Sequence, residues 1–320
     1  MYDGETLLLK RGLTTTRLVL RIKAMAQTTV NLKSNTAAPT NWKTWLGVAP
    51  FFLFAILFLF LPSLRLFTAS FTDIDGKFTF DNIIQLFSEP FIVEAYKLSI
   101  QISAVTALGG GILGFLLAYS VTVGGLPKPL RSILITFSGV ASNFAGVPLA
   151  FAFVATLGRQ GFVTHILKDY FNVNIYDAGF NLYSFIGLSL VYMYFQFPLM
   201  VLIMAPALDG LKREWREAAE NLGASTTQYW LKVAMPVLLP SILGAMILLF
   251  GNAFGAYATA YALTGGRIGI VTIQIGAQIR GDVLYNPGLG YAMAIGMVAI
   301  MAISLAAYSW LQAKTERWLK

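Results

Sequence analysis

The sequence predicts an all-α integral membrane protein with six transmembrane helices and both termini in the cytoplasm. Of its 320 residues, 57% are hydrophobic and 12% are charged, whereas an average soluble domain is about 25% charged. Charged residues are absent from six long stretches of the chain, and the basic residues are concentrated on alternate sides of these stretches. These three observations predict the fold class, the number of spans and the orientation.

The composition excludes several other classes of protein. A chain with so much apolar content and so little charge is not intrinsically disordered as a whole. It contains no cysteine, which excludes disulfide frameworks, thiol catalysis and cysteine-ligated zinc or iron–sulfur sites. The net charge of +8 follows from the predicted topology, so we expect no nucleic-acid partner.

Each charge-free stretch is long enough for a helix that crosses the bilayer, which requires about 20 apolar residues. Strands of a membrane barrel would alternate in hydrophobicity, whereas these stretches are continuously apolar. The six spans form one predicted domain at 44–313. They are expected at about 44–64, 98–123, 133–157, 183–205, 237–263 and 288–311.

Lysine and arginine give the predicted orientation, because cytoplasmic segments are enriched in them. With a cytoplasmic N-terminus, 16 of the 23 basic residues fall on the cytoplasmic side. That side includes a basic leader at 1–43, which we expect to be disordered, and a tail at 314–320. Translation from Met25 instead of Met1 is an open alternative that would remove most of the leader.

Prolines and glycines within the spans indicate where helices bend or pack. Pro62 is expected to end the first span, and Pro148 and Pro198 are expected to kink or break the third and fourth. The GxxxG pairs Gly110–Gly114 and Gly251–Gly255 permit close approach of two helices. Secondary carriers usually have broken helices in both halves, and the sequence shows no sign of them.

Uncharged polar side chains within the spans are candidates for a substrate pathway. An amide in lipid must find a hydrogen-bond partner or face water, so it either joins two helices or lines a path. The pathway candidates are Asn143, Gln196, Asn252 and Tyr257. Gln196 and Asn252 are favoured, because helix breakers beside them would free backbone groups for a ligand. We predict no catalytic residue and no metal site.

The segment at 206–236, between the fourth and fifth spans, differs from the rest of the chain. Its apolar residues recur at helical spacing. They are Leu211, Trp215, Ala218, Ala219 and Leu222. Gly223 is a natural residue to end this helix, and Ser225 with Gln228 fits a capping box that begins a second helix. The first helix is expected to lie on lipid head groups or to dock a cytoplasmic partner.

The same segment resembles the EAA motif of ATP-binding-cassette (ABC) importer permeases, EAA-x3-G-x9-I-x-LP. The matching residues are Glu217, Ala218, Ala219, Gly223 and, after nine residues, Val233-x-Met235-Pro236. Valine replaces isoleucine and methionine replaces leucine, while every spacing is kept. The resemblance covers about 98–311 and implies a type I ABC importer permease fold. It also implies that this loop forms a coupling helix, with Glu217, Ala218, Ala219, Gly223 and Pro236 as the coupling residues.

The resemblance further implies the partners of the chain. These are two ATP-binding cassette subunits, which would bind ATP and Mg²⁺, a second permease subunit, an extracytoplasmic solute-binding protein and membrane lipid. The chain itself would hold no cofactor and would not be an enzyme. It would be a multi-pass protein of the bacterial inner membrane that forms half of the translocation pathway.

The substrate is less constrained than the family. Phe195-Gln196-Phe197-Pro198 and the residues around Gly223 look most like the spermidine/putrescine branch, which implies a polyamine or another small charged solute. A polycation pathway would benefit from an intramembrane carboxylate, and the spans contain none. Phosphonate or another organic anion, a metal ion and a sugar stay open as substrates. The alternative function is a secondary carrier or channel that acts without ATPase partners.

Overall fold

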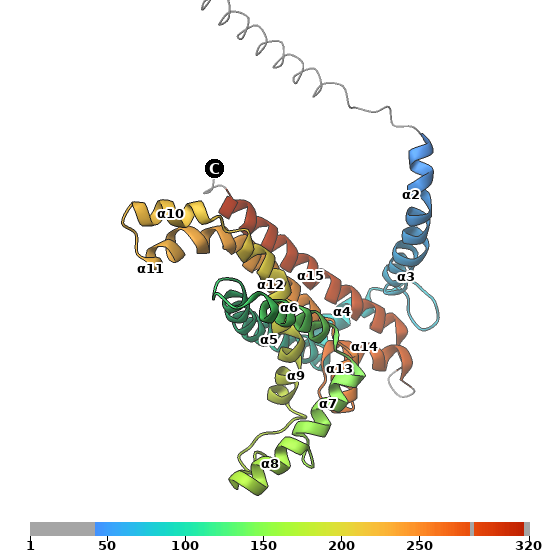
Figure 1. The fold of residues 1–320 in the computed structure, drawn as a ribbon. Coiled ribbons are helices and arrows are strands. Elements are labelled where there is room, and N and C mark those ends of the chain that lie inside the picture. Colours follow the sequence, from blue (N-terminus) through green and yellow to red (C-terminus); the bar gives the residue numbers. More distant parts are fainter. Residues whose placement is uncertain (1–41, 282–284, 317–320) are drawn as a thin grey trace, which may run out of the picture. The chain divides into compact units, whose positions relative to one another are not determined.

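The computed structural model describes residues 42–281 and 285–316 (Figure 1). Within those residues the regular elements are helices, apart from one isolated antiparallel bridge between Thr72 and Phe78. The predicted leader lies outside the described residues except for Trp42 and Lys43, as do Met25 and the tail residues 317–320. The chain divides into two compact units, Met1–Leu64 and Arg65–Lys320.

The first membrane-length helix passes through a proline without ending. It consists of α2 (Trp42–Ala55), the π-helical turn η1 (Ile56–Phe60) and α3 (Leu61–Ala69). The Leu61 N–H donates to the carbonyl of Ile56, five residues back. Because Pro62 has no N–H to donate, a widened turn before it accommodates the missing hydrogen bond. The prediction that Pro62 ends the first span is therefore wrong.

Six helical segments among the described residues are long and apolar enough to cross a membrane, as the sequence predicts. They are Gly47–Ala69, Pro90–Thr122, Val147–Phe171, Phe185–Asp209, Thr226–Phe254 and Pro287–Lys314. Three of these segments correspond to single helices, α5 (Pro90–Thr122), α9 (Phe185–Asp209) and α15 (Pro287–Glu316). Two shorter helices, α4 (Asp81–Ser88) and α14 (Val271–Arg280), lie outside the six segments. α9 continues through Pro198, so the expected break there does not occur.

The third predicted span, 133–157, is not one continuous helix. α6 (Lys128–Asn143) ends before Gly146, whose φ of +76° interrupts the helical path, and α7 (Val147–Leu157) then begins. Pro148 is the second residue of α7, where a missing N–H leaves no helical hydrogen bond unmade. Pro148 thus lies at the start of a helix instead of kinking one. α8 (Phe162–Phe171) follows, and the membrane-length segment here runs over α7 and α8.

The fifth predicted span, 237–263, is also interrupted. α12 (Met235–Phe254) ends at Gly255, and α13 (Ala258–Thr264) begins after Tyr257. The two interruptions are joined, because the Gly146 N–H donates to the hydroxyl of Thr259 at 2.7 Å. The structure therefore contains paired broken helices that the sequence did not reveal.

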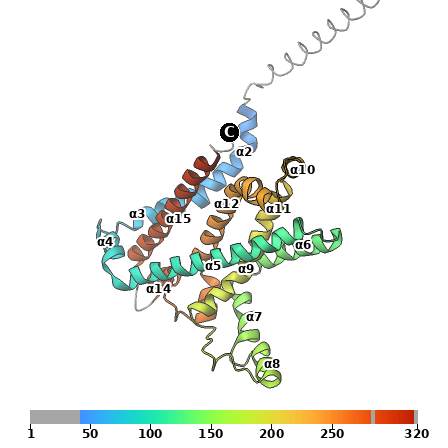
Figure 2. The same ribbon diagram turned by 90° about the vertical axis from the view of Figure 1, so that its left-hand side faces the viewer.

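Close packing of α5 on α9 forms the centre of the second unit (Figure 2). A Cβ atom added at Gly110 would lie 2.5 Å from the Cβ of Gln196, and one at Gly114 would lie 2.5 Å from the Cβ of Met200. The prediction that the first GxxxG pair brings two helices together is confirmed. The buried residues beside this contact include Val201, Met204, Leu208, Leu238 and Leu249.

The second GxxxG pair acts differently. Gly251 packs against the Met301 side chain of α15, where an added Cβ would lie 2.5 Å from the methionine Cε. Gly255 is the residue that follows α12, and an added Cβ there would meet only the Gly251 carbonyl, at 3.5 Å. Only the first glycine of this pair therefore takes part in helix packing.

Candidate functional site

The 206–236 segment, hereafter the EAA loop, folds into two short helices after the end of α9. These are α10 (Arg213–Asn221) and α11 (Thr226–Tyr229), which continues through the π-helical turn η2 (Trp230–Ala234) into α12. α10 and α11 lie side by side at one end of α12 (Figure 1). The amphipathic helix and the second helix that the sequence predicts are thus both present.

Gly223 forms the turn between α10 and α11 as the sequence predicts. Its φ is +77°, a left-handed conformation that glycine adopts without the penalty imposed by a Cβ. The Gly223 N–H donates to the Glu220 carbonyl, and the Ala224 N–H donates to the Ala219 carbonyl. These two bonds form a Schellman motif, which satisfies the last carbonyls of α10 and fixes the direction in which the chain leaves it.

The predicted capping box begins α11. The Ser225 N–H donates to the Gln228 side chain at 2.8 Å, and the Gln228 N–H donates to the Ser225 hydroxyl at 3.3 Å. Each residue therefore satisfies a backbone group of the other at the start of the helix.

Ser225→Ala is expected to lower the free energy of unfolding by about 1 kcal/mol, the usual cost of removing a side-chain cap. Thermal unfolding of the purified chain in detergent measures this change. Thr226→Ala is the matched control, since the adjacent Thr226 side chain is exposed and does not cap the helix. Equal midpoints for Ser225→Ala and the unmodified chain would show that the box contributes nothing.

α10 has no buried residue, and all of its side chains are exposed except that of Ala219, which is half-buried. Glu217 pairs with Arg213 at 3.0 Å and Glu220 with Arg216 at 2.9 Å, both within the helix. The apolar side chain of Leu222, which follows the last residue of α10, is 88% exposed. The helix thus exposes carboxylates and guanidinium groups, and an uncovered apolar residue lies at its C-terminal end.

Pro236, the last predicted coupling residue, lies at the second position of α12. The π-helical turn before it has the same cause as the turn before Pro62. The Met235 N–H donates to the carbonyl of Trp230, five residues back, while Pro236 has no N–H to donate. The Trp230 ring packs edge-on against the Tyr119 ring of α5, with the two ring centroids 5.0 Å apart. This contact anchors the C-terminal end of the EAA loop on the helix core.

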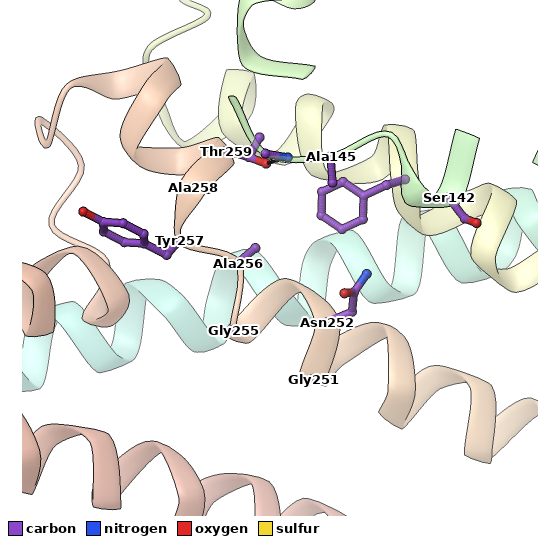
Figure 3. A pocket seen from close by; sticks show the side chains of 11 residues that line it. Ser142, Ala145, Gly251, Asn252, Gly255, Ala256, Tyr257, Ala258 and Thr259 are labelled. Carbon is purple, nitrogen blue, oxygen red and sulfur yellow. Dashed lines mark hydrogen bonds between the residues drawn. The ribbon is translucent and has the colours of Figure 1, made fainter. Parts of the chain in front are cut away.

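A cavity of about 380 Å³ lies between the two helix interruptions (Figure 3). We call it the break cavity. It is lined by Ser142, Ala145, Gly146, Phe195, Gly251, Asn252, Gly255, Ala256, Tyr257, Ala258 and Thr259. These residues come from the end of α6, from α9, from the end of α12, from the start of α13 and from both interruptions. Its walls thus consist of uncharged polar and apolar groups.

Two of the four predicted pathway residues line this cavity. Asn252 extends its amide from α12 toward the segment that carries Ala145, whereas the Tyr257 ring points away from the other side chains of the lining (Figure 3). Asn143 is not part of the lining, and its amide donates to the Gly139 carbonyl of its own helix at 2.9 Å.

Gln196 is fully buried and lies outside the lining of the break cavity. Its Nε2 donates to the Leu249 carbonyl of α12 at 2.8 Å, while its Oε1 has no hydrogen-bond partner. One turn earlier on α9, the Tyr192 hydroxyl donates to the Ala256 carbonyl at 2.6 Å. Both side chains therefore hold the interrupted end of α12 against α9. Of the two roles that the sequence allows for Gln196, joining two helices or lining a pathway, this contact corresponds to the first.

Sequence reasoning missed Ser142, Gly146 and Thr259, which also line the cavity. The charge-free stretch at 132–158 is no longer than those at 98–127 and 178–208, which also contain glycine and form the continuous helices α5 and α9. Neither the length of a stretch nor its glycine content therefore signals an interruption.

A family model described as "Binding-protein-dependent transport system inner membrane component" matches residues 110–317. The sulfate transport system permease protein CysW of Escherichia coli K12 is 26% identical over 91% of this chain and 95% of its own length. The spermidine/putrescine transport system permease protein PotB of Haemophilus influenzae is 24% identical over 82% of this chain and 91% of its own length.

A solved structure has a similar fold. It is that of a bacterial ABC transporter involved in the import of the acidic polysaccharide alginate. The matched chain superimposes with a TM-score of 0.68 at 16% sequence identity, covering 86% of this chain and 96% of the other. At this identity the likeness concerns the fold alone, and it agrees with the predicted importer permease architecture.

Proposed function

The chain belongs to the family of binding-protein-dependent transport system inner membrane components, the permease subunits of ABC importers, and we propose that it couples solute import to ATP hydrolysis through the EAA loop. The observation that carries this proposal is the exposed helix α10, which ends in the Schellman turn at Gly223. An exposed charged helix with a fixed exit direction suits a rigid contact with another protein. Glu217, Ala218 and Ala219 would form that contact.

The proposed assembly contains two ATP-binding cassette subunits, a second permease subunit and an extracytoplasmic solute-binding protein. ATP and Mg²⁺ would be bound by the cassette subunits, and this chain would supply half of the pathway in a bacterial inner membrane. The break cavity is the proposed substrate contact of this half. Alternating access would then be a shift between conformational states, driven by the different affinities of the partners for each state.

We propose that the solute is a small oxyanion of the sulfate type. The Asn252 amide in the cavity lining is a hydrogen-bond donor (Figure 3), and no carboxylate lines the cavity. Such a site suits an anion better than a polycation, whose charge would require a carboxylate in the membrane. A polyamine is the second candidate, supported by the similarity to PotB, which is no greater than the similarity to CysW.

Uptake by proteoliposomes containing the chain with its ATPase subunits, second permease and binding protein tests the function. We expect ATP-dependent accumulation of radiolabelled sulfate, and its loss in Asn252→Asp, because a carboxylate in the cavity repels the anion. Asn143→Asp is the control, since Asn143 lies outside the cavity lining. Uptake by the chain alone without ATP would establish the carrier alternative, and accumulation of spermidine instead of sulfate would overturn the proposed substrate.

A further inference from the structure

An ion pair joins the first turn of α6 to the last residue of α9. Arg131 donates a hydrogen bond from its guanidinium to the Asp209 carboxylate, and α6 packs along α9 (Figure 2). The other ion pairs in the described residues join groups three or four residues apart on one helix. Among those residues, the Arg131–Asp209 pair is thus the one that connects two different helices.

Each of the two charges lies at the unfavourable end of its own helix. Arg131 is in the first turn of α6, and Asp209 ends α9. A helix dipole disfavours a cation at the N-terminus and an anion at the C-terminus. The pair therefore neutralises two charges that their own helices do not stabilise, and this favours keeping the two helix ends together.

The position of the pair connects the two candidate functional regions. Asp209 is separated from α10 only by residues 210–212, so it lies at the root of the EAA loop. At its opposite end α6 carries Ser142, which lines the break cavity. At 1.5 Å per residue, the helix from Arg131 to Ser142 extends roughly 16 Å from the ion pair to the cavity.

We propose that Arg131 and Asp209 are positioning residues that make α6 follow the root of the EAA loop, so that movement of α10 reaches the break cavity. This inference rests on the proposed function, in which α10 receives the movement of an ATPase subunit. Partly exposed ion pairs contribute little to stability. The expected consequence of breaking the pair is therefore lost communication between the two regions, with folding and assembly retained.

A distance measurement in the assembled complex tests the inference. The chain has no cysteine, so Val140→Cys on α6 and Leu248→Cys on α12 provide two specific sites for spin labels. Both side chains are well exposed. The complex with its ATPase subunits in nanodiscs is measured without nucleotide and after trapping with ATP and vanadate. We expect trapping to change the distance between the labels.

Arg131→Gln and Asp209→Asn are each expected to reduce this distance change to less than half, with vanadate trapping unaltered. The exchange Arg131→Asp with Asp209→Arg restores the pair and places each charge at the favourable end of its helix, so it should restore the change. Lys97→Gln is the matched control, because it removes an exposed ion pair within α5 and should leave the distance change intact.

A full distance change in Arg131→Gln, or no distance change in the unmodified complex, would overturn the inference. Failure of the exchange variant to restore the change would do the same. A complex that traps no vanadate in the ATPase subunits would instead contradict the proposed function, so the two failures are distinguishable.

Discussion

Replacing Gly223 with valine is expected to abolish most ATP-driven uptake while the complex still assembles in the membrane. Gly223 has a φ of +77°, and a Cβ added there would meet no atom within 4 Å. The penalty therefore comes from backbone strain alone. It amounts to about 1–2 kcal/mol for a left-handed residue with a side chain, and such a conformation is a genuine outlier for a β-branched residue.

A penalty of this size lowers the ratio of native to non-native turn by roughly 5–30-fold. The Schellman bonds from Gly223 and Ala224 would be lost with it, and α10 would leave the turn in a different direction. Uptake into proteoliposomes and the ATPase activity of the complex measure the effect together. We expect uptake to fall by up to the same factor, with ATP hydrolysis no longer responding to the loaded binding protein.

Two control variants separate this effect from general destabilisation. Gly76 has a φ of +80° in an exposed turn and also has no atom within 4 Å of an added Cβ. Gly76→Val thus imposes the same kind of strain outside the EAA loop and should leave uptake intact. Gly223→Asn should retain much of the uptake, because asparagine tolerates the left-handed conformation. Normal uptake by Gly223→Val would rule out a coupling role for this turn.

The sequence was sufficient for the EAA loop because its structure is stabilised locally. The Schellman bonds at Gly223 and the capping box at Ser225 join residues no more than five positions apart. Their partners are therefore visible in the sequence. The close approach at Gly110 and Gly114 was predictable for a similar reason, since the residue type itself removes the steric barrier.

The interruptions of the third and fifth spans depend on contacts that the sequence does not display. The left-handed Gly146 is held by the Thr259 hydroxyl, 113 positions away, and the Ala256 carbonyl by Tyr192, 64 positions away. Proline alone was a poor guide to breaks. Pro62 follows a π-helical turn that keeps the helix continuous, whereas the actual break near Pro148 occurs before the proline.

Gly110→Ala is expected to destabilise the helix core strongly. The added methyl group would lie 2.5 Å from the Gln196 Cβ and 3.3 Å from the backbone of Gln196 and Phe197. Backbone atoms cannot rotate away as a flexible side chain can, so α5 and α9 must separate. Inserting a methyl group into a close-packed contact costs about 1–3 kcal/mol. Separation would also strain the Gln196 hydrogen bond to the Leu249 carbonyl.

Thermal unfolding of the purified chain in detergent measures the destabilisation. Gly114→Ala should behave similarly, because its added methyl group would meet the Phe197 carbonyl and the Met200 Cβ. Gly139→Ala is the matched control within α6, where nothing lies within 4 Å of an added Cβ. There the higher helix propensity of alanine should stabilise the chain by up to about 1 kcal/mol.

The sign of the difference between these substitutions is decisive. Alanine in place of glycine favours an isolated helix at all three positions, so propensity alone would raise the unfolding midpoint of every variant. Only the α5–α9 contact lowers it, and only at Gly110 and Gly114. An increased midpoint for Gly110→Ala would mean that the two helices lie further apart in the membrane, and that Gln196 does not hold α12 as described.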